Sequence, residues 1–186
     1  MKKLKDRITG LTKVKYVLPL SSRKTICEGI FNSVLTYCMP VWGGSDQCEL
    51  QSLQVLQNTA LCHVLHHPPY SNRDELYNQL DCMTVKQLIV YHSILTVYKI
   101  RQSGEPEYLK EILSNDNIRG NLAIPVTDLT LAMKSFCYRA GYDWNSLPNE
   151  IRSIRKLDQF KSKLRKWVKA SITRFIQWLK EAIKPT

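Results

Sequence analysis

Glycine and proline are scarce in this 186-residue chain, which contains 7 of the first and 8 of the second. Long linkers and low-complexity segments are therefore excluded, because such segments are rich in these residues. Apolar residues make up 44% of the chain and charged residues 23%, as in an ordinary globular domain. A chain of this length buries one core or two small ones, so we expect one domain or a domain with a subdomain.

Long hydrophobic runs are also missing. The longest, from Ile89 to Ile100, is interrupted by polar residues such as His92 and Lys99, and it is shorter than the roughly eighteen residues that a membrane span needs. Lysines and an arginine follow Met1 without the continuous apolar stretch of a signal peptide. We therefore expect an intracellular protein, in the nucleus or the cytoplasm, that is not secreted and has no transmembrane segment.

The motifs of common enzymes are absent as well. The sequence has no GxxxxGK, GxGxxG, GxSxG or HExxH motif and no paired aspartates of a polymerase. His92 lies among apolar residues at helical spacing, which favours a core or boundary histidine over a catalytic base. We expect the isolated chain to have no catalytic residue, no cofactor and no enzymatic activity.

The cysteines follow no repeated spacing and include no CxxC pair, which fits neither a disulfide framework nor a zinc ribbon. We expect reduced thiols that are mostly buried. Cys62, His63, His66 and His67 are residue types that zinc prefers. On a helix, however, Cys62 and His66 share one face while His63 and His67 share another, so a complete ligand set would require the distant Cys82. We therefore expect no metal site.

Positive charge is concentrated at the two ends of the chain. The 27 basic and 16 acidic residues give a net charge of +11. Residues 1–30 hold eight basic and two acidic residues, residues 151–186 hold eleven and two, and the segment between them holds eight and twelve. Grouped lysines and arginines gain affinity for a polyanion through counterion release. This distribution favours a nucleic-acid partner, and the alternative is a solvated basic surface without one.

Apolar residues recur every three or four positions, and no stretch shows the sustained alternation of a half-buried strand. The pattern predicts helices over residues 4–17, 21–39, 50–65, 84–100 and 157–183, with shorter ones between them. Candidate capping residues are Ser45 or Asp46 for the third of these helices, Asn72 or Asp74 for a short helix that ends at Leu80, and Thr84 for the fourth. In the second of these, Val34 and Tyr37 continue the apolar spacing. We expect an all-α fold, an irregular bundle of about seven to nine helices with a long basic amphipathic C-terminal helix.

That last helix places apolar residues such as Phe160, Leu164 and Val168 on one face and basic residues around the rest. It can dock on the body and offer its basic face to phosphates, lie on an anionic membrane surface, or pack into a partner's groove. Docking is favoured for Phe160 to Val168, which continues the preceding globular pattern. The destination of the residues from Ala170 to Thr186 stays open.

Several strings in the chain together resemble one protein family. They are LPLSSRKT (Leu18–Thr25), YCMPVWGG (Tyr37–Gly44), LQVLQNTAL (Leu53–Leu61) and, after Arg139, WNSLPNEIR (Trp144–Arg152), followed by Phe160 and Lys161. In this order they resemble the segment that follows the polymerase palm in reverse transcriptases of non-LTR retrotransposons, here of the jockey-like kind. The resemblance covers about Lys3 to Lys169.

The resemblance implies that the first third of the chain is the thumb, the helical subdomain that grips template and primer, and that the rest is the C-terminal region. It also implies that the metal-binding aspartates and the endonuclease belong to parts of such a protein that this chain does not include. Cys62 stands where the family usually carries arginine and Cys82 where it often carries tryptophan. These departures would remove a phosphate contact and an aromatic anchor.

We therefore expect a non-catalytic fragment of such an RNA-directed DNA polymerase, binding RNA or an RNA:DNA duplex through its phosphates. We divide the chain into a thumb-like subdomain (1–67), a helical C-terminal region (68–169) and an amphipathic helical tail (170–186). The alternative is a helical interaction protein whose basic tail binds an anionic membrane surface or a partner helix. The predicted nucleic-acid contacts are the basic residues of the first, second and last helices: Lys3, Lys5, Arg7, Lys13, Lys15, Arg23, Lys24, Lys161, Lys163, Arg165, Lys166 and Lys169.

Overall fold

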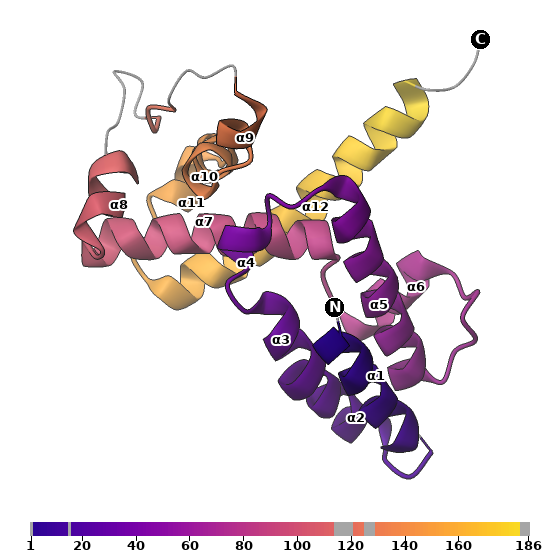
Figure 1. Cartoon of the computed structure of the whole chain (residues 1–186). Helices are drawn as coiled ribbons and strands as arrows, with labels where there is room; N and C mark the ends of the chain where they lie inside the picture. Colours follow the sequence, from indigo (N-terminus) through magenta and orange to yellow (C-terminus); the bar gives the residue numbers. More distant parts are fainter. Residues whose placement is uncertain (1, 15, 114–120, 125–128, 183–186) are drawn as a thin grey trace. The chain divides into compact units, whose positions relative to one another are not determined.

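The computed structural model describes residues 2–14, 16–113, 121–124 and 129–182, and the side chains of these residues except 14, 130 and 171–182. The chain divides into two compact units, Met1–Leu88 and Ile89–Thr186. Both units are helical, and none of the described residues forms a strand (Figure 1). The predicted all-α class is thus confirmed.

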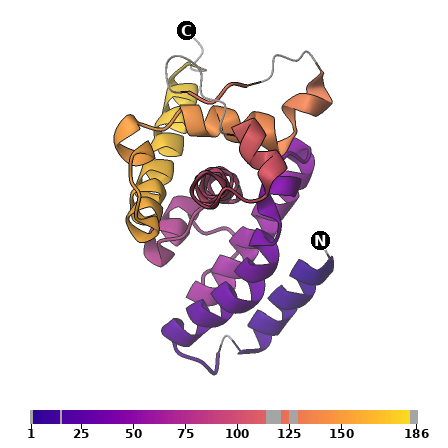
Figure 2. The same ribbon diagram turned by 90° about the vertical axis from the view of Figure 1, so that its left-hand side faces the viewer.

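The first unit is built around α5, the long helix on which the N-terminal helices pack. Its elements are α1 (Lys2–Val14), α2 (Leu20–Ile26), the π-helix η1 (Cys27–Asn32), α3 (Ser33–Thr36), α4 (Met39–Trp42), α5 (Gln47–Leu65) and α6 (Arg73–Leu80). Helix α1 packs against α5, η1, α2 and α3 (Figure 2). It does so because Leu4, Ile8 and Leu11, at spacings of four and three, form one buried stripe.

A polar network joins α5 to the segment that leads from α6 into the next helix, α7, which spans Val85–Ser103. The Gln54 side-chain oxygen accepts a hydrogen bond from the Val85 N–H at 2.9 Å. The Gln57 amide donates to the Met83 carbonyl at 2.9 Å, and Gln57 is only 2% exposed. These bonds hold α6 and the start of α7 on α5, which explains why the first compact unit extends to Leu88, whereas the sequence analysis ends its first subdomain at His67.

The second unit comprises most of α7 and the helices that follow it. These are α8 (Glu107–Leu113), α9 (Thr130–Met133), α10 (Phe136–Asn145), α11 (Asn149–Arg152) and α12 (Leu157–Ala182). Tyr98 of α7 stacks on Phe160 of α12, with ring centroids 3.9 Å apart, and Trp144 of α10 lies 6.3 Å from Phe160. The Tyr98 hydroxyl also donates to the Arg155 carbonyl at 2.6 Å, so this aromatic cluster fixes the start of α12 on α7.

Several helix ends fall where the sequence predicts them, because their capping chemistry is local. The Asn72 side chain accepts a hydrogen bond from the Asp74 N–H and begins α6. Thr84 begins α7 through a reciprocal pair of bonds with Gln87, at 2.9 Å and 3.3 Å. His66 ends α5 in the left-handed conformation, with φ of 59°.

The described residues form more helices than the predicted seven to nine, because α4, α9 and α11 are single turns of four residues. The last helix, α12, runs over Leu157–Ala182, close to its predicted bounds. Its side chains from Ser171 onward lie outside the described residues, so the basic amphipathic character of that half stays a prediction. No helix among the described residues is both long and apolar enough to span a bilayer.

Candidate nucleic-acid interface

The exposed side of α1 carries the predicted cations of the first helix. Lys3, Lys5, Arg7 and Lys13 are all exposed, and we call these residues the α1 basic surface. They are fixed in place because the other side of α1 is buried against α5. Lys15, also predicted as a contact, lies outside the described residues.

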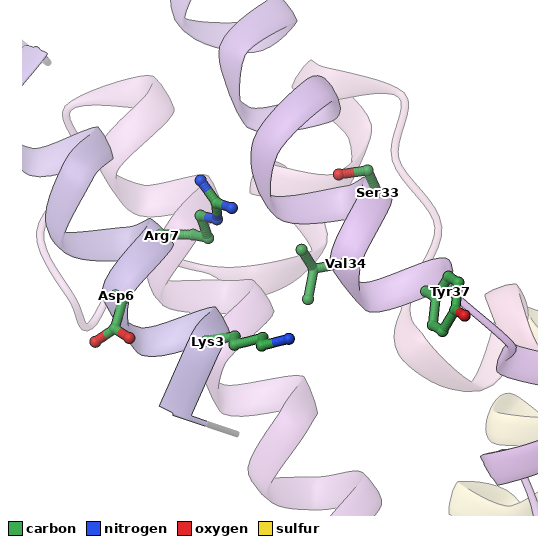
Figure 3. Close-up of a pocket in the computed structure, with 6 residues that line it drawn as sticks. All are labelled: Lys3, Asp6, Arg7, Ser33, Val34 and Tyr37. Carbon is green, nitrogen blue, oxygen red and sulfur yellow. The ribbon is translucent and has the colours of Figure 1, made fainter.

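Two members of this surface face a pocket between α1 and α3. Lys3 and Arg7, one helical turn apart, extend toward Val34 and Ser33, whereas Asp6 points away (Figure 3). The pocket has a volume of about 600 Å³. Its lining consists of Lys3, Asp6, Arg7, Ser33, Val34 and Tyr37. A pocket of this kind combines positive charge with an aromatic ring and a hydroxyl, and we call it the Tyr37 pocket.

Tyr37 was missed as a site residue, since the sequence analysis places it on an apolar helix face. Its side chain is instead 75% exposed. The register changes in η1, where π-helical turns hold more residues than α-helical ones, and the helix ends at Thr36. Tyr37 then adopts an extended conformation, with φ of −61° and ψ of 124°. Its place beside a helix break was the signal that could have identified it.

The backbone that carries Tyr37 is held by the turn that follows it. The Trp42 indole N–H donates to the Tyr37 carbonyl at 2.8 Å. Cys38 has a positive φ of 49°, and its carbonyl accepts the Val41 N–H at 2.9 Å. Trp42 also lines an adjoining pocket of about 350 Å³, which shares Lys3 and Val34 with the Tyr37 pocket. The exposed ring is therefore attached to an anchored backbone.

The two predicted contacts of the second helix have different surroundings. The Arg23 guanidinium is partly buried and donates to the Val64 carbonyl, near the end of α5. Arg23 therefore joins α2 to α5, and we leave it out of the interface. Lys24 is half-buried in the same helix. Neither residue lines the Tyr37 pocket.

In the second unit, α12 carries the remaining predicted contacts. Lys163, Arg165 and Lys166 are exposed, and Lys161 and Lys169 are half-buried. These five residues are called the α12 basic surface below. Phe160, Leu164 and Val168, on the other face, are fully buried, which confirms that this half of the helix docks on the body. Lys161 lies 4.0 Å from the carboxylate of Asp158, so part of its charge is already compensated.

The cysteine and histidine cluster around the end of α5 forms a second kind of pocket. Cys62, His63, His66 and His67 line a cavity of about 540 Å³ together with Arg73. Burial raises the pKa of the Cys62 thiol, and the charge of Arg73 opposes this rise. Across the described residues, no three histidine, cysteine or acidic side chains lie together as metal ligands would. Burial thus disfavours the charged form of the Cys62 thiol.

The sequence also predicts how deeply His92 and the cysteines are buried. His92 is half-buried, and burial together with Lys99 lowers its pKa, which agrees with a boundary position. No disulfide joins the six cysteines, all of which are described. Cys27 and Cys62 are buried, but Cys38 and Cys48 are exposed. Cys82 and Cys137 are half-buried, so only two of the six thiols are buried and the prediction of mostly buried thiols is wrong.

Comparisons with known proteins find no matching family model, no similar curated protein and no similar solved structure. The interface must therefore be judged from its own chemistry. Lys3 and Arg7 offer charge and hydrogen-bond donors, while Tyr37 offers an exposed ring. Charged donors can bind a phosphate, and an exposed ring can stack on a planar group.

Proposed function

We propose that the chain is the non-catalytic thumb and C-terminal part of a non-LTR retrotransposon reverse transcriptase, and that it binds RNA or an RNA:DNA duplex through backbone phosphates. The observation that carries the binding proposal is the α1 basic surface, with Lys3 and Arg7 extended toward one pocket. Contacts between such cations and phosphates position a nucleic acid without reading its sequence.

Rigid presentation of these cations supports the proposal. Leu4, Ile8 and Leu11 hold α1 on α5, so its side chains need no folding step before they meet a strand. Cations on a fixed helix lose less conformational entropy on binding than cations on a loose tail. Lys3 and Arg7, one turn apart on α1, therefore suit contacts with neighbouring phosphates.

The assignment to a reverse transcriptase rests on the ordered sequence strings. One of them, Tyr37–Gly44, forms the turn that anchors Tyr37 through the Trp42 indole. Another, Leu53–Leu61, belongs to α5, against which α1 packs. The resembling strings thus supply the support of the pocket, which favours a shared role in holding nucleic acid.

We extend the proposal to the C-terminal helix. Its docked half presents Lys163, Arg165 and Lys166, and we propose that the basic amphipathic pattern continues to Ala182. The α12 basic surface would then supply further phosphate contacts. Because Lys161 and Lys169 are half-buried, we expect the three exposed residues to contribute most.

The salt dependence of binding tests the proposal. We expect the affinity for an RNA:DNA hybrid to fall steeply between low and physiological salt, because each neutralised phosphate releases counterions. Substituting Lys3→Gln, Lys5→Gln and Arg7→Gln together should reduce the slope of log affinity against log salt by about 2 to 3. Fluorescence anisotropy with a labelled hybrid measures both quantities.

A matched control removes the same number of charges elsewhere. Lys86, Lys110 and Lys134 are exposed and line neither pocket beside α1. The variant with Lys86→Gln, Lys110→Gln and Lys134→Gln should keep the slope of the unaltered chain. Equal slopes for both triple variants would show that net charge alone drives binding, and a flat salt response of the unaltered chain would contradict the proposal.

The interaction-protein alternative depends on residues 171–186. Deleting them separates the two ideas, because the α1 basic surface remains intact. Under our proposal the shortened chain keeps most of its affinity for the hybrid. Loss of hybrid binding on this deletion would contradict the proposal that the α1 basic surface carries it. Loss of binding to anionic vesicles would assign the membrane role of the alternative to the tail.

A further inference from the structure

We infer that the Tyr37 pocket holds one unpaired nucleotide, with its base stacked on the Tyr37 ring and its phosphate against Lys3 and Arg7. This inference rests on the proposed nucleic-acid binding and deepens it, since it names the form of nucleic acid that the pocket accepts. Phosphate contacts alone would suit a duplex equally well. The exposed Tyr37 ring in the same pocket can stack on a base, and a site for backbone phosphates alone would not need such a ring.

The state of the Tyr37 side chain supports stacking. The ring is 75% exposed, although apolar rings are usually buried, and it lines a pocket with two cations. Its carbonyl is fixed by the Trp42 indole at 2.8 Å, and Cys38 turns the chain sharply behind it. A ring on an anchored backbone loses little freedom when a base covers it, so more of the stacking energy remains for binding.

The remaining lining fits the other parts of a nucleotide. The volume of about 600 Å³ lies within the range of roughly 300 to 1,000 Å³ that is usual for small-molecule sites. The Ser33 hydroxyl donates to the Gly29 carbonyl at 2.6 Å, which leaves its oxygen as an acceptor for a ribose hydroxyl. Asp6 also lines the pocket, but its carboxylate points away from Lys3 and Arg7, so the two cations outnumber it beside a phosphate.

A base-paired strand does not satisfy this set of groups. In a duplex each base is already stacked between its neighbours, and only its edges reach the grooves. Away from the duplex ends, Tyr37 has no access to a base face unless the nucleotide is unpaired. The pocket should therefore favour a single strand, or the overhang beside a duplex, over a blunt duplex of the same charge.

Three oligonucleotides with equal numbers of phosphates decide the inference: an unpaired strand, a blunt duplex of half its length, and an abasic strand that keeps only sugars and phosphates. The unaltered chain should bind the unpaired strand about fivefold or more tightly than the abasic strand. Tyr37→Leu should remove this difference and leave affinity for the duplex and the abasic strand unchanged. Tyr37→Phe should retain it, since phenylalanine keeps the ring.

Tyr70→Leu is the matched control, because Tyr70 is 96% exposed and lies outside the pocket. It should bind all three oligonucleotides as the unaltered chain does. If the unaltered chain binds the abasic strand, or anionic vesicles of equal charge, as tightly as the unpaired strand, the pocket senses charge alone and the inference is wrong. This comparison needs no variant, so it decides even if Tyr37→Leu fails to fold. A steep salt response in the same assay would leave the proposed function standing.

Discussion

At the scale of single residues, Asp143 carries a charge that its surroundings disfavour. Burial raises the pKa of its carboxyl from 3.8 to about 6, and the charge of Arg139 only partly opposes this. Between these two pH values the folded chain binds more protons than the unfolded chain, so stability falls as pH rises through this window and stays lower above it. Asp143→Asn should therefore raise the free energy of unfolding at pH 7, by on the order of 1 to 3 kcal/mol, and remove the fall between pH 4 and 6.

Urea unfolding of the variant and the unaltered chain at several pH values measures this difference. Asp158→Asn is a suitable control, because the Asp158 side chain is 99% exposed and lies in the first turn of α12, where a negative charge is favourable. It should not raise stability at pH 7. If the free energy of unfolding varied with pH in the same way for the unaltered chain and Asp143→Asn, ionisation of Asp143 would not destabilise the folded state, and the prediction would be wrong.

Some positions of the candidate site residues could be predicted from the sequence and others could not. Charge and helical spacing were sufficient to place Lys3, Lys5 and Arg7 on the exposed side of the first helix. They were not sufficient for Arg23, whose guanidinium bonds to Val64, because a contact across 41 residues leaves no local pattern. Tyr37 was missed for the related reason that its exposure depends on a change of helical register.

At the scale of helices, two glycines test how tightly α1 and α10 are packed. A side chain at Gly10 would meet nothing within 4 Å, whereas a Cβ at Gly141 would lie 3.0 Å from the Ile124 side chain. Gly10→Ala should stabilise the chain by about 0.5 to 1 kcal/mol, because alanine favours the helix. Gly141→Ala should destabilise it by about 1 kcal/mol, because overpacking outweighs the same gain. Chemical denaturation of both variants provides the comparison.

The affinity for nucleic acid provides a control for the two glycine variants. Gly10 lines neither pocket beside α1, so Gly10→Ala should leave the affinity for an RNA:DNA hybrid unchanged. Stabilisation by both substitutions would show that Ile124 moves aside easily and that α10 is loosely packed.

Helix bounds were predicted well where the signals are short-range. Asn72, Thr84 and His66 each act within a few residues of the end that they cap. The π-helix η1 and the one-turn helix α4 were not predicted, because their geometry depends on how Phe31 and Met39 pack in the core. Helix caps can thus be predicted from the sequence, whereas changes of helical register that depend on core packing cannot.

At the scale of the whole molecule, the chain carries two basic surfaces in two compact units. The division after Leu88 was not predicted, since it depends on the bonds from Gln54 and Gln57 to the start of α7. Each surface offers only a few exposed cations, so each alone should bind a short strand weakly at physiological salt. A longer strand gains affinity if it contacts both surfaces at once.

A length series tests whether one strand contacts both surfaces. Once an unpaired oligonucleotide spans both, the second contact becomes intramolecular, and affinity should rise at least tenfold over a short strand. Lys163→Gln with Lys166→Gln should abolish this rise and lower the affinity for short strands only by the small share that the α12 basic surface contributes alone. A gradual rise that only follows the number of binding registers along the strand would show that the two surfaces act independently. The affinity for a long strand would then be the statistical sum of separate contacts with each surface, with no gain from linking them.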